Sequence, residues 1–276
     1  VPAKTIICFF WINKHYEKNQ LEQSKYDPKE RAYRLRGTKF PNGGVHVTTG
    51  IVNASDLNKI AKEKGTTLTG YVTALLLYSI YETRLKYERS NKPAMAALPV
   101  SMRKIFPSRT LRNFFIVIMI GQKMNKEVTL DELIQMVSNG MKEQTTKEYL
   151  QYRLFVIGKY DKVRFNKVVP LDIKKLFINT VFNTISEVKR TITISNLGLI
   201  KVPTDMYQYV QVMEAILYPT TRCPYNCSLS SFNNKLLFNF ARNVEEKDII
   251  RFFFTWLTQK DNLPVTVYSN NWEEAK

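Results

Sequence analysis

The sequence predicts an α/β fold, arranged as an α+β two-layer sandwich in which helices cover mainly one face of a mixed sheet. Three observations predict it. Strand-like segments alternate with long helical segments along the 276 residues, an antiparallel hairpin comes late in the chain, and the composition is 44% hydrophobic with only ten Gly and eleven Pro. That composition is typical of a folded globular protein, and the length suffices for one large or two modest domains.

The first half of the chain contains three predicted strands and two predicted helices. Residues 44–52, "GVHVTTGIV", alternate as a strand does. Ser55 is expected to cap a helix that ends at Gly65, and Thr69 to cap a longer helix through Tyr87 that is apolar around most of its circumference. "AALPVSMR" and "FFIVIMIGQ" are predicted strands, joined by the basic loop "KIFPSRTLRN". Residues 1–43 are predicted to be a linker or a wrapped N-terminal segment, and residues 44–276 the main domain.

The second half is predicted to begin with helices and to end with strands around a last helix. Thr129 opens one helix, a second helical stretch covers about 146–166, and Pro170 starts a third. Strands are expected at "TITIS", at "YVQVMEAIL" and in the hairpin "CSLSSFNNKLLFNFAR", whose turn is Asn233-Asn234. The last helix places apolar residues at i, i+4, i+7 and i+8, and "LPVTVYS" is a closing strand.

Lys and Arg exceed Asp and Glu by 41 to 24, a formal charge of +17. Such an excess favours acidic partners: nucleic acid, anionic lipid or a phosphorylated cofactor. No RNP1-like segment, zinc finger or strong helix-turn-helix signal is present, so no specific nucleic-acid partner is predicted. No apolar run reaches the ~18 residues of a membrane helix, and no cleavage site follows the apolar start, so neither a membrane span nor a signal peptide is predicted.

The three cysteines are an odd number and too few for a disulfide framework, which favours a reducing, cytoplasmic location. "CPYNC" places Cys223 and Cys227 at a spacing that metal ligands can have. His15 and His46, the only histidines, do not support it, so no metal site is predicted. Either histidine can be an exposed or hydrogen-bonded side chain or a catalytic base. Because phosphate-loop, dinucleotide, nucleophile-elbow and zinc-protease motifs are all missing, the sequence lacks an obvious general base.

Two local features can carry chemistry. In "TITISNLG" the strand alternation stops at Ser195, Asn196 and Gly198. A serine at a strand end can donate a hydrogen bond to an oxyanion in a cleft; alternatively, Ser195 and Asn196 only bond nearby backbone in a turn. The second feature is "PVSMRKIFPSRTLRNFF", a loop that can bind phosphate or be solvated surface. Its polar residues are Arg103, Lys104, Arg109, Arg112 and Asn113.

Together these segments resemble a known family. "TITISNLG" is similar to the "FTISNLG" segment of dihydrolipoyl acyltransferases, which share their fold with chloramphenicol acetyltransferase. From about Tyr33 onward, "YRLRGTKF", "LPVSMRKIFPSRTLRNFF", "ITISNLGLIKVP" and "CSLSSFNNKLLFNFARNVEEKDIIRFFFTWL" follow one another as in bacterial alcohol-acetyltransferase-like proteins. Those proteins belong to the condensation-domain branch of the coenzyme-A-dependent acyltransferases.

The resemblance implies a protein of two similar α/β halves with an active-site tunnel between them. The second His of an HHxxxDG motif in the N-terminal half is the base, and it deprotonates an alcohol or amine that attacks a thioester. This chain resembles the C-terminal half: it has no HHxxxDG, and Ala241, Arg242 and Asn243 stand where dihydrolipoyl acyltransferases have DHR. Ser195 then matches the oxyanion donor.

The resemblance further implies that the remaining polar residues of the two features line the site. Asn113, Arg103 and Asn196 would form the tunnel wall, and the loop cations Lys104, Arg109 and Arg112 would contact coenzyme A. No covalently bound cofactor is expected. The expected partners are acyl-CoA or an acyl carrier protein as donor, a small alcohol or amine as acceptor, and the N-terminal half-domain. Two alternatives stay open: a non-catalytic binding module derived from this fold, and nucleic-acid binding by charge alone.

Overall fold

The computed structural model describes residues 30–41, 43–88, 90–106, 108–109, 113–161 and 187–270. These residues form a seven-stranded sheet in the order β3-β2-β4-β5-β6-β1-β7. The strands are β1 (His46–Asn53), β2 (Ala94–Ser101), β3 (Phe115–Gln122), β4 (Ile192–Leu199), β5 (Tyr225–Phe232), β6 (Lys235–Arg242) and β7 (Thr266–Ser269). β2, β4 and β5 are mutually parallel and the other neighbours antiparallel, which confirms the predicted mixed sheet.

The described helices are α2 (Ala54–Glu63), α3 (Leu68–Ile80), α4 (Lys86–Glu88), α5 (Leu130–Gln144), α6 (Lys147–Asp161) and α9 (Asp248–Gln259). A wide π-helical turn, η1 (Tyr81–Leu85), joins α3 to α4. Short 3₁₀ turns lie at η2 (Met102–Lys104), η4 (Glu187–Lys189) and η5 (Thr204–Met206). None of the helices in the described ranges is both long and apolar enough to cross a bilayer.

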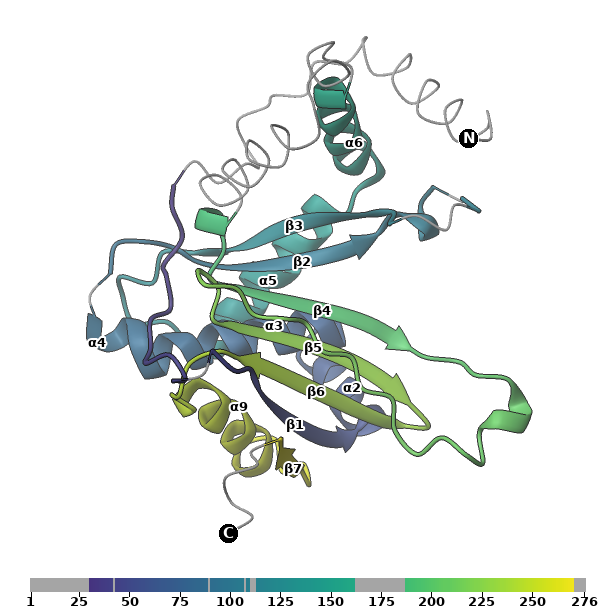
Figure 1. Cartoon of the computed structure of the whole chain (residues 1–276). Coiled ribbons are helices and arrows are strands. Elements are labelled where there is room, and N and C mark those ends of the chain that lie inside the picture. Colours follow the sequence, from purple (N-terminus) through teal and green to yellow (C-terminus); the bar gives the residue numbers. More distant parts are fainter. Residues whose placement is uncertain are drawn as a thin grey trace.

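The main core lies between one face of the sheet and helices α2, α3, α5 and α9. The α3 helix is buried on every side between Tyr71 and Leu77, as its unbroken apolar sequence predicts. From the sheet, Phe238 and Phe240 each meet the ring of Phe253 on α9 edge to face, at 5.2 Å between centroids. Helix α6 lies at the edge formed by β3 (Figure 1). The two-layer arrangement with helices mainly on one face is therefore confirmed.

The described part of the N-terminal segment crosses the chain starts of the central strands. The backbone N–H of Ala32 donates to Val188 and that of Tyr33 to Pro93. The Tyr33 hydroxyl, on a buried ring, donates to Glu88 at 2.7 Å. These contacts attach residues 30–39 to the domain that begins at residue 44.

Local sequence signals place most element ends, with two corrections. Thr129 caps α5 in a full capping box, and Asn233 and Asn234 form the hairpin turn with φ of 47° and 59°, both as predicted. The predicted caps of the first two helices are wrong by two residues. Asn53 caps α2 instead of Ser55, and Thr67 caps α3 instead of Thr69. The predicted helix from Pro170, and the end of the helical stretch beyond 161, lie outside the described residues.

Candidate functional site

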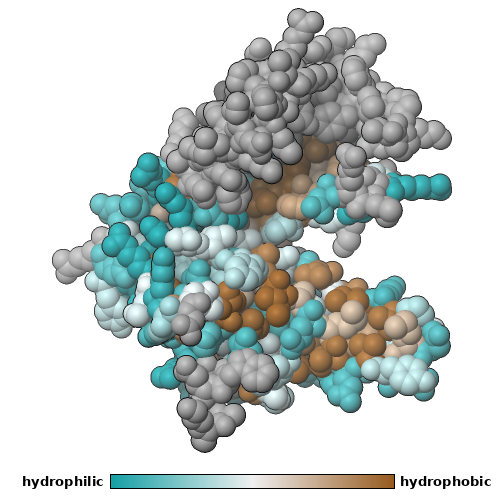
Figure 2. Space-filling view, in the orientation of Figure 1, coloured by the Kyte–Doolittle hydropathy of each residue, from teal (hydrophilic) through white to brown (hydrophobic). Residues whose placement is uncertain are grey.

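The sheet opens between its third and second strands in the order, β4 and β2. β2 pairs with β3 over eight positions, but with β4 only through Ala96–Ile192 and Ala97–Thr193. Beyond Thr193 the two strands part, and Figure 2 shows the resulting notch between the tip of the β2–β3 hairpin and the β4–β5 region. Crevices at the carboxyl ends of parallel strands are where α/β sheets bind ligands. The notch is therefore the candidate site.

Ser195 lies on β4 two residues past the last β2–β4 pair. Ile192 and Ile194 are buried against the helices, so the strand alternation turns Ser195 to the opposite face. Its side chain is half-buried, and among the described residues its hydroxyl has no hydrogen-bond partner. The turn interpretation required that hydroxyl to bond nearby backbone. A hydroxyl without a protein partner beside an opening is available to a ligand.

Asn196 faces the other way. Its side-chain N–H donates to the Thr69 hydroxyl at the start of α3, at 2.8 Å. Its side-chain oxygen accepts from the backbone N–H of Gly198, also at 2.8 Å, and Gly198 has φ of 73°. Asn196 therefore ties the end of β4 to a helix and shapes the turn that follows. The structure does not bring its amide to the face that carries Ser195.

The basic loop occupies the tip of the β2–β3 hairpin, across the notch from β4 (Figure 1). Ser101 pairs with Phe115, and the chain between them carries Arg103, Arg109 and Asn113, all exposed. Arg103 is four residues beyond Pro99, the position level with Ser195, or about 13 Å along the strand at ~3.3 Å per residue. The tip thus borders the opening without reaching Ser195 along the strand. The side chain of Lys104 and all of Arg112 lie outside the described residues.

The face that carries Ser195 holds a polar row that sequence reasoning missed. Ser195 is in register with Ser228, Ser228 with Asn239, and Asn239 with Thr49, so four adjacent strands each contribute one polar side chain at the same level. The last three are nearly inaccessible, and the Thr49 hydroxyl donates to the Asn239 side-chain oxygen at 2.9 Å. The available signal was a polar residue at alternate positions of otherwise apolar strands. This row leads from the notch toward the far edge of the sheet.

A segment predicted to be a strand covers part of this polar face. Residues 209–217 have no regular secondary structure, so that prediction is wrong. Side chains of β5, instead of a backbone ladder, hold the segment: Ser230 donates to the Met213 carbonyl at 2.6 Å, Ser228 to the Ala215 carbonyl, and Asn226 to the Tyr218 carbonyl at 2.7 Å. The segment's alternating apolar residues are consequently not paired on two faces as in a strand.

The chain from Leu197 to Tyr218, here called the arm, runs out beyond the sheet and returns (Figure 1). Figure 2 shows hydrophobic surface gathered over this region. Its exposed large apolar side chains are Leu197, Leu199, Met206, Tyr207, Tyr209, Ile216 and Tyr218. Apolar surface gathered in this way marks a contact site for another protein part.

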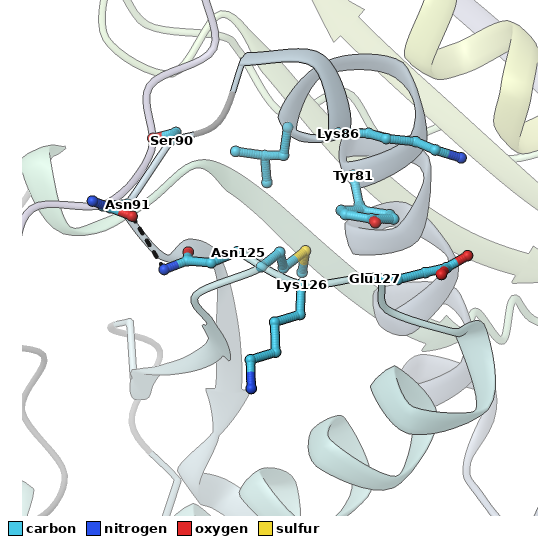
Figure 3. A pocket seen from close by; sticks show the side chains of 9 residues that line it. Tyr81, Lys86, Ser90, Asn91, Asn125, Lys126 and Glu127 are labelled. Atoms are coloured by element: carbon cyan, nitrogen blue, oxygen red, sulfur yellow. Dashed lines mark hydrogen bonds between the residues drawn. The ribbon is translucent and has the colours of Figure 1, made fainter.

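The pocket drawn in Figure 3 has a volume of about 350 Å³ and lies elsewhere, between η1 and the β3–α5 loop. Its floor is Tyr81, Leu85 and Met124, and Asn125 bonds Asn91 across it at 3.1 Å. The lysines at its rim, Lys86 and Lys126, point apart, so their charges do not converge (Figure 3). The pocket shares no residue with the notch. Although it is larger than other pockets in the described part of the chain, we do not assign it chemistry.

The remaining candidate groups are away from the notch. His46 stacks on Phe40 with ring centroids 3.8 Å apart, and it is level with Arg242 at the opposite end of the sheet from Ser195. Cys223 and Cys227 are buried free thiols. Burial raises the pKa of Cys223 to about 11 and that of Cys227 well above its ordinary value. In the described ranges no three His, Cys, Asp or Glu side chains form a metal-binding group. His15 and Cys8 lie outside those ranges.

No protein-family model matches the sequence, and no curated protein sequence matches it. Several solved structures match the fold. The epimerization domain from the third module of tyrocidine synthetase B is 11% identical with a TM-score of 0.55, over 94% of this chain and 58% of that chain. A wax ester synthase/diacylglycerol acyltransferase from Marinobacter aquaeolei VT8 is 13% identical with a TM-score of 0.50, over 95% and 58%.

The trichothecene 15-O-acetyltransferase TRI3 from Fusarium sporotrichioides is 14% identical with a TM-score of 0.51, over 81% of this chain and 49% of that chain. The chain therefore spans between 49% and 58% of the length of these three structures. Their shared architecture, with the mixed sheet and its helices, confirms the predicted fold: this chain has the chloramphenicol acetyltransferase-like fold of condensation domains and acyltransferases.

Proposed function

We propose that the chain is the C-terminal half of a thioester-dependent acyltransferase and that Ser195 is its oxyanion donor. The observation that carries the proposal is the Ser195 hydroxyl, which has no partner among the described residues and lies where β2 and β4 part. A donor placed in advance near the reacting carbonyl stabilises the charge that develops on its oxygen.

The reaction follows from that position. A base removes the proton from the alcohol or amine acceptor, whose oxygen or nitrogen attacks the thioester carbonyl carbon. The carbonyl oxygen becomes an oxyanion and accepts the Ser195 hydrogen bond. When the intermediate collapses, the carbon–sulfur bond breaks, the thiolate takes the proton held by the base, and an ester or amide and a free thiol leave.

The base is assigned to an N-terminal half of a longer protein, as the second His of its HHxxxDG motif. The described histidine, His46, is at the wrong end of the sheet for this role. The apolar arm supports a covering half, because exposed side chains such as Leu199 and Tyr209 are suited to a protein contact. In this arrangement the notch is one wall of a tunnel, and Asn113 and Arg103 border it.

The proposed donor is acyl-CoA or an acylated carrier protein, and the proposed acceptor is a small alcohol or amine. Support comes from the charge of the hairpin tip, where Arg103 and Arg109 are exposed and Lys104 and Arg112 lie in the same loop. Guanidinium and ammonium groups bind phosphate by charge-assisted hydrogen bonds. Coenzyme A acts here as a co-substrate and not as a resident cofactor.

The test is an assay of thiol release from acetyl-CoA with a panel of alcohols and amines, on this chain and on the longest natural product of its gene. We expect activity in the longer protein, and Ser195→Ala should lower kcat by about 10²-fold or more. Ser269→Ala, an exposed strand serine of β7 at the other side of the sheet, is the matched control and should leave kcat unchanged.

An unchanged kcat in Ser195→Ala would contradict the oxyanion assignment. Activity in the 276-residue chain alone would contradict the assignment of the base to another half. The second candidate function is a non-catalytic binding module, which the exposed arm favours. If both proteins are inactive beside a working positive control, the module replaces the acyltransferase as the conclusion.

A further inference from the structure

A second pocket, with a volume of about 230 Å³, lies at the opposite end of the sheet from the notch. Three segments form it: the N-terminal stretch 34–39, the loop before β5 (Thr221, Pro224), and the chain after β6 (Asn243, Val244). β5 begins at Tyr225 and is eight residues long, so about 25 Å of strand separates this pocket from the carboxyl end of β5. It is therefore not part of the proposed acyl-transfer site.

The charged side chains that line this pocket are all cationic. They are Arg34, Arg36 and Lys39, each exposed, and no carboxylate is among the lining residues. Within the described part of the chain none of the three forms an ion pair. A neutral group, the Thr221 carbonyl, orients Arg34 through a bond of 3.2 Å from its Nη2. Three like charges in one concave site are unfavourable unless an anion joins them.

The backbone that carries these cations is fixed. Lys39 pairs with Val244 in a β-bridge, and the backbone N–H of Glu245 donates to the Thr38 carbonyl at 2.8 Å. The nearby acid, Glu246, accepts from the Thr38 backbone N–H at 2.8 and 3.0 Å and from its hydroxyl at 3.1 Å. Its carboxylate is therefore bound to Thr38 and does not neutralise the arginines.

Gly37 permits this arrangement. A Cβ on Gly37 would lie 2.2 Å from the Glu246 Oε2 atom and 2.9 Å from the Val244 side chain. The glycine lets the basic stretch approach the chain after β6 closely enough to form the pocket wall.

We infer that this pocket binds the phosphate group of a small molecule. Two arginines two residues apart on an extended stretch present planar groups of donors that match phosphate oxygens, and Lys39 adds a third positive charge. The volume exceeds that of a phosphate ion, so the group can belong to a phosphomonoester with an organic part. The inference does not depend on acyl transfer, because it uses none of the residues at the notch.

The test is calorimetric titration of the whole chain at low salt with inorganic phosphate and with adenosine 3′,5′-bisphosphate. Arg36→Gln should weaken binding of both probes by about tenfold, as expected when one charge-assisted hydrogen bond is lost. Arg31→Gln is the control: Arg31 is exposed on the same stretch but does not line the pocket, and its loss should change affinity by less than about twofold.

The two probes distinguish the source of the phosphate. Tighter binding of the bisphosphate assigns a nucleotide-type ligand, and equal affinity assigns the free ion or a simple ester. The melting temperature of Arg36→Gln, an exposed substitution, should match that of the parent chain, so weaker binding reports the pocket. Equal weakening by Arg31→Gln would show diffuse charge instead of a site, and lack of saturable binding in the parent would overturn the inference directly.

Discussion

The Asn196 side chain donates a 2.8 Å hydrogen bond to the Thr69 hydroxyl, which joins β4 to the first turn of α3. The bond forms two residues after Thr67, the cap of that helix. It fixes the rotation of β4 at the residue next to Ser195. The direction of the Ser195 hydroxyl thus depends on a contact made on the opposite face of the sheet.

Replacing Asn196 by Ala should lower the free energy of unfolding by about 1–3 kcal/mol, because the Gly198 N–H and the Thr69 hydroxyl lose their partner. Urea unfolding measures this change. Asn196→Asp retains an oxygen that accepts from both groups, so it should lose less. If Ala and Asp lower the stability equally, the two hydrogen bonds do not contribute as described.

Gly121 on β3 should not tolerate a side chain. A Cβ there would lie 1.9 Å from the Ala94 carbonyl oxygen and 2.8 Å from the Met95 Cα, and both are backbone atoms of the paired strand β2. Gly121→Ala should therefore cost about 1–3 kcal/mol of unfolding free energy, typical of overpacking. Gly44→Ala is the matched control, since a Cβ there meets nothing within 4 Å. A Gly121→Ala protein with the stability of the control would contradict the close β2–β3 packing.

Alkaline pH should destabilise the fold through the buried thiols. Burial raises the pKa of Cys223 to about 11 and raises that of Cys227 further, whereas unfolded thiols titrate near 9. Above pH 9 the unfolded chain releases these protons and the folded chain keeps them, so stability falls as pH rises. Each thiol contributes about 1.4 kcal/mol per pH unit in this range.

Urea unfolding between pH 8 and 10.5 in reductant measures that slope. Cys227→Ala should make the fall with pH shallower, because only Cys223 then contributes in the thiol range. Burial and its hydrogen bond to Glu88 raise the pKa of Tyr33 in the same sense, so the slope should steepen above pH 10. A stability that is constant from pH 8 to 10 would show that the thiols are accessible in the folded protein.

The apolar arm should cause this chain to self-associate when it is isolated. Leu197 and Leu199 are 53% and 62% exposed, so changing both to Ser should lower association while the melting temperature changes little. Sedimentation velocity over a concentration series measures the effect. Lys201→Ser, an exposed polar change on the same arm, is the control. A parent chain that stays monomeric at high concentration would contradict the prediction.

Local signals predicted the parts of the fold that local interactions determine. The Asn233-Asn234 turn and the Thr129 capping box depend on residues within three positions, and both were predicted correctly. The helix start at Thr67 was not, because Thr69, the predicted cap, instead bonds Asn196, 127 residues away. Pairwise packing across the chain decided that position.

The candidate site was only partly predictable for the same reason. The end of alternation at "TITISNLG" identified Ser195, but its open surroundings depend on how many residues of β2 and β4 pair, and neither strand encodes that number alone. The polar row required the registers of four strands. The segment 209–217 misled because its alternation resembles a strand, while its carbonyls accept from Ser228 and Ser230 on β5.

The short ladder between β2 and β4 makes the width of the notch a property of the core. With only two paired positions there, sheet hydrogen bonds do not set the angle between the β2–β3 hairpin and the rest of the sheet. Helix packing sets it, for instance where α5 brings Gly140 against Ile120 of β3. Selectivity for the size of a bound group is then encoded in residues that never touch it, and substitutions under α5 would retune the aperture while every polar group at its mouth stayed the same.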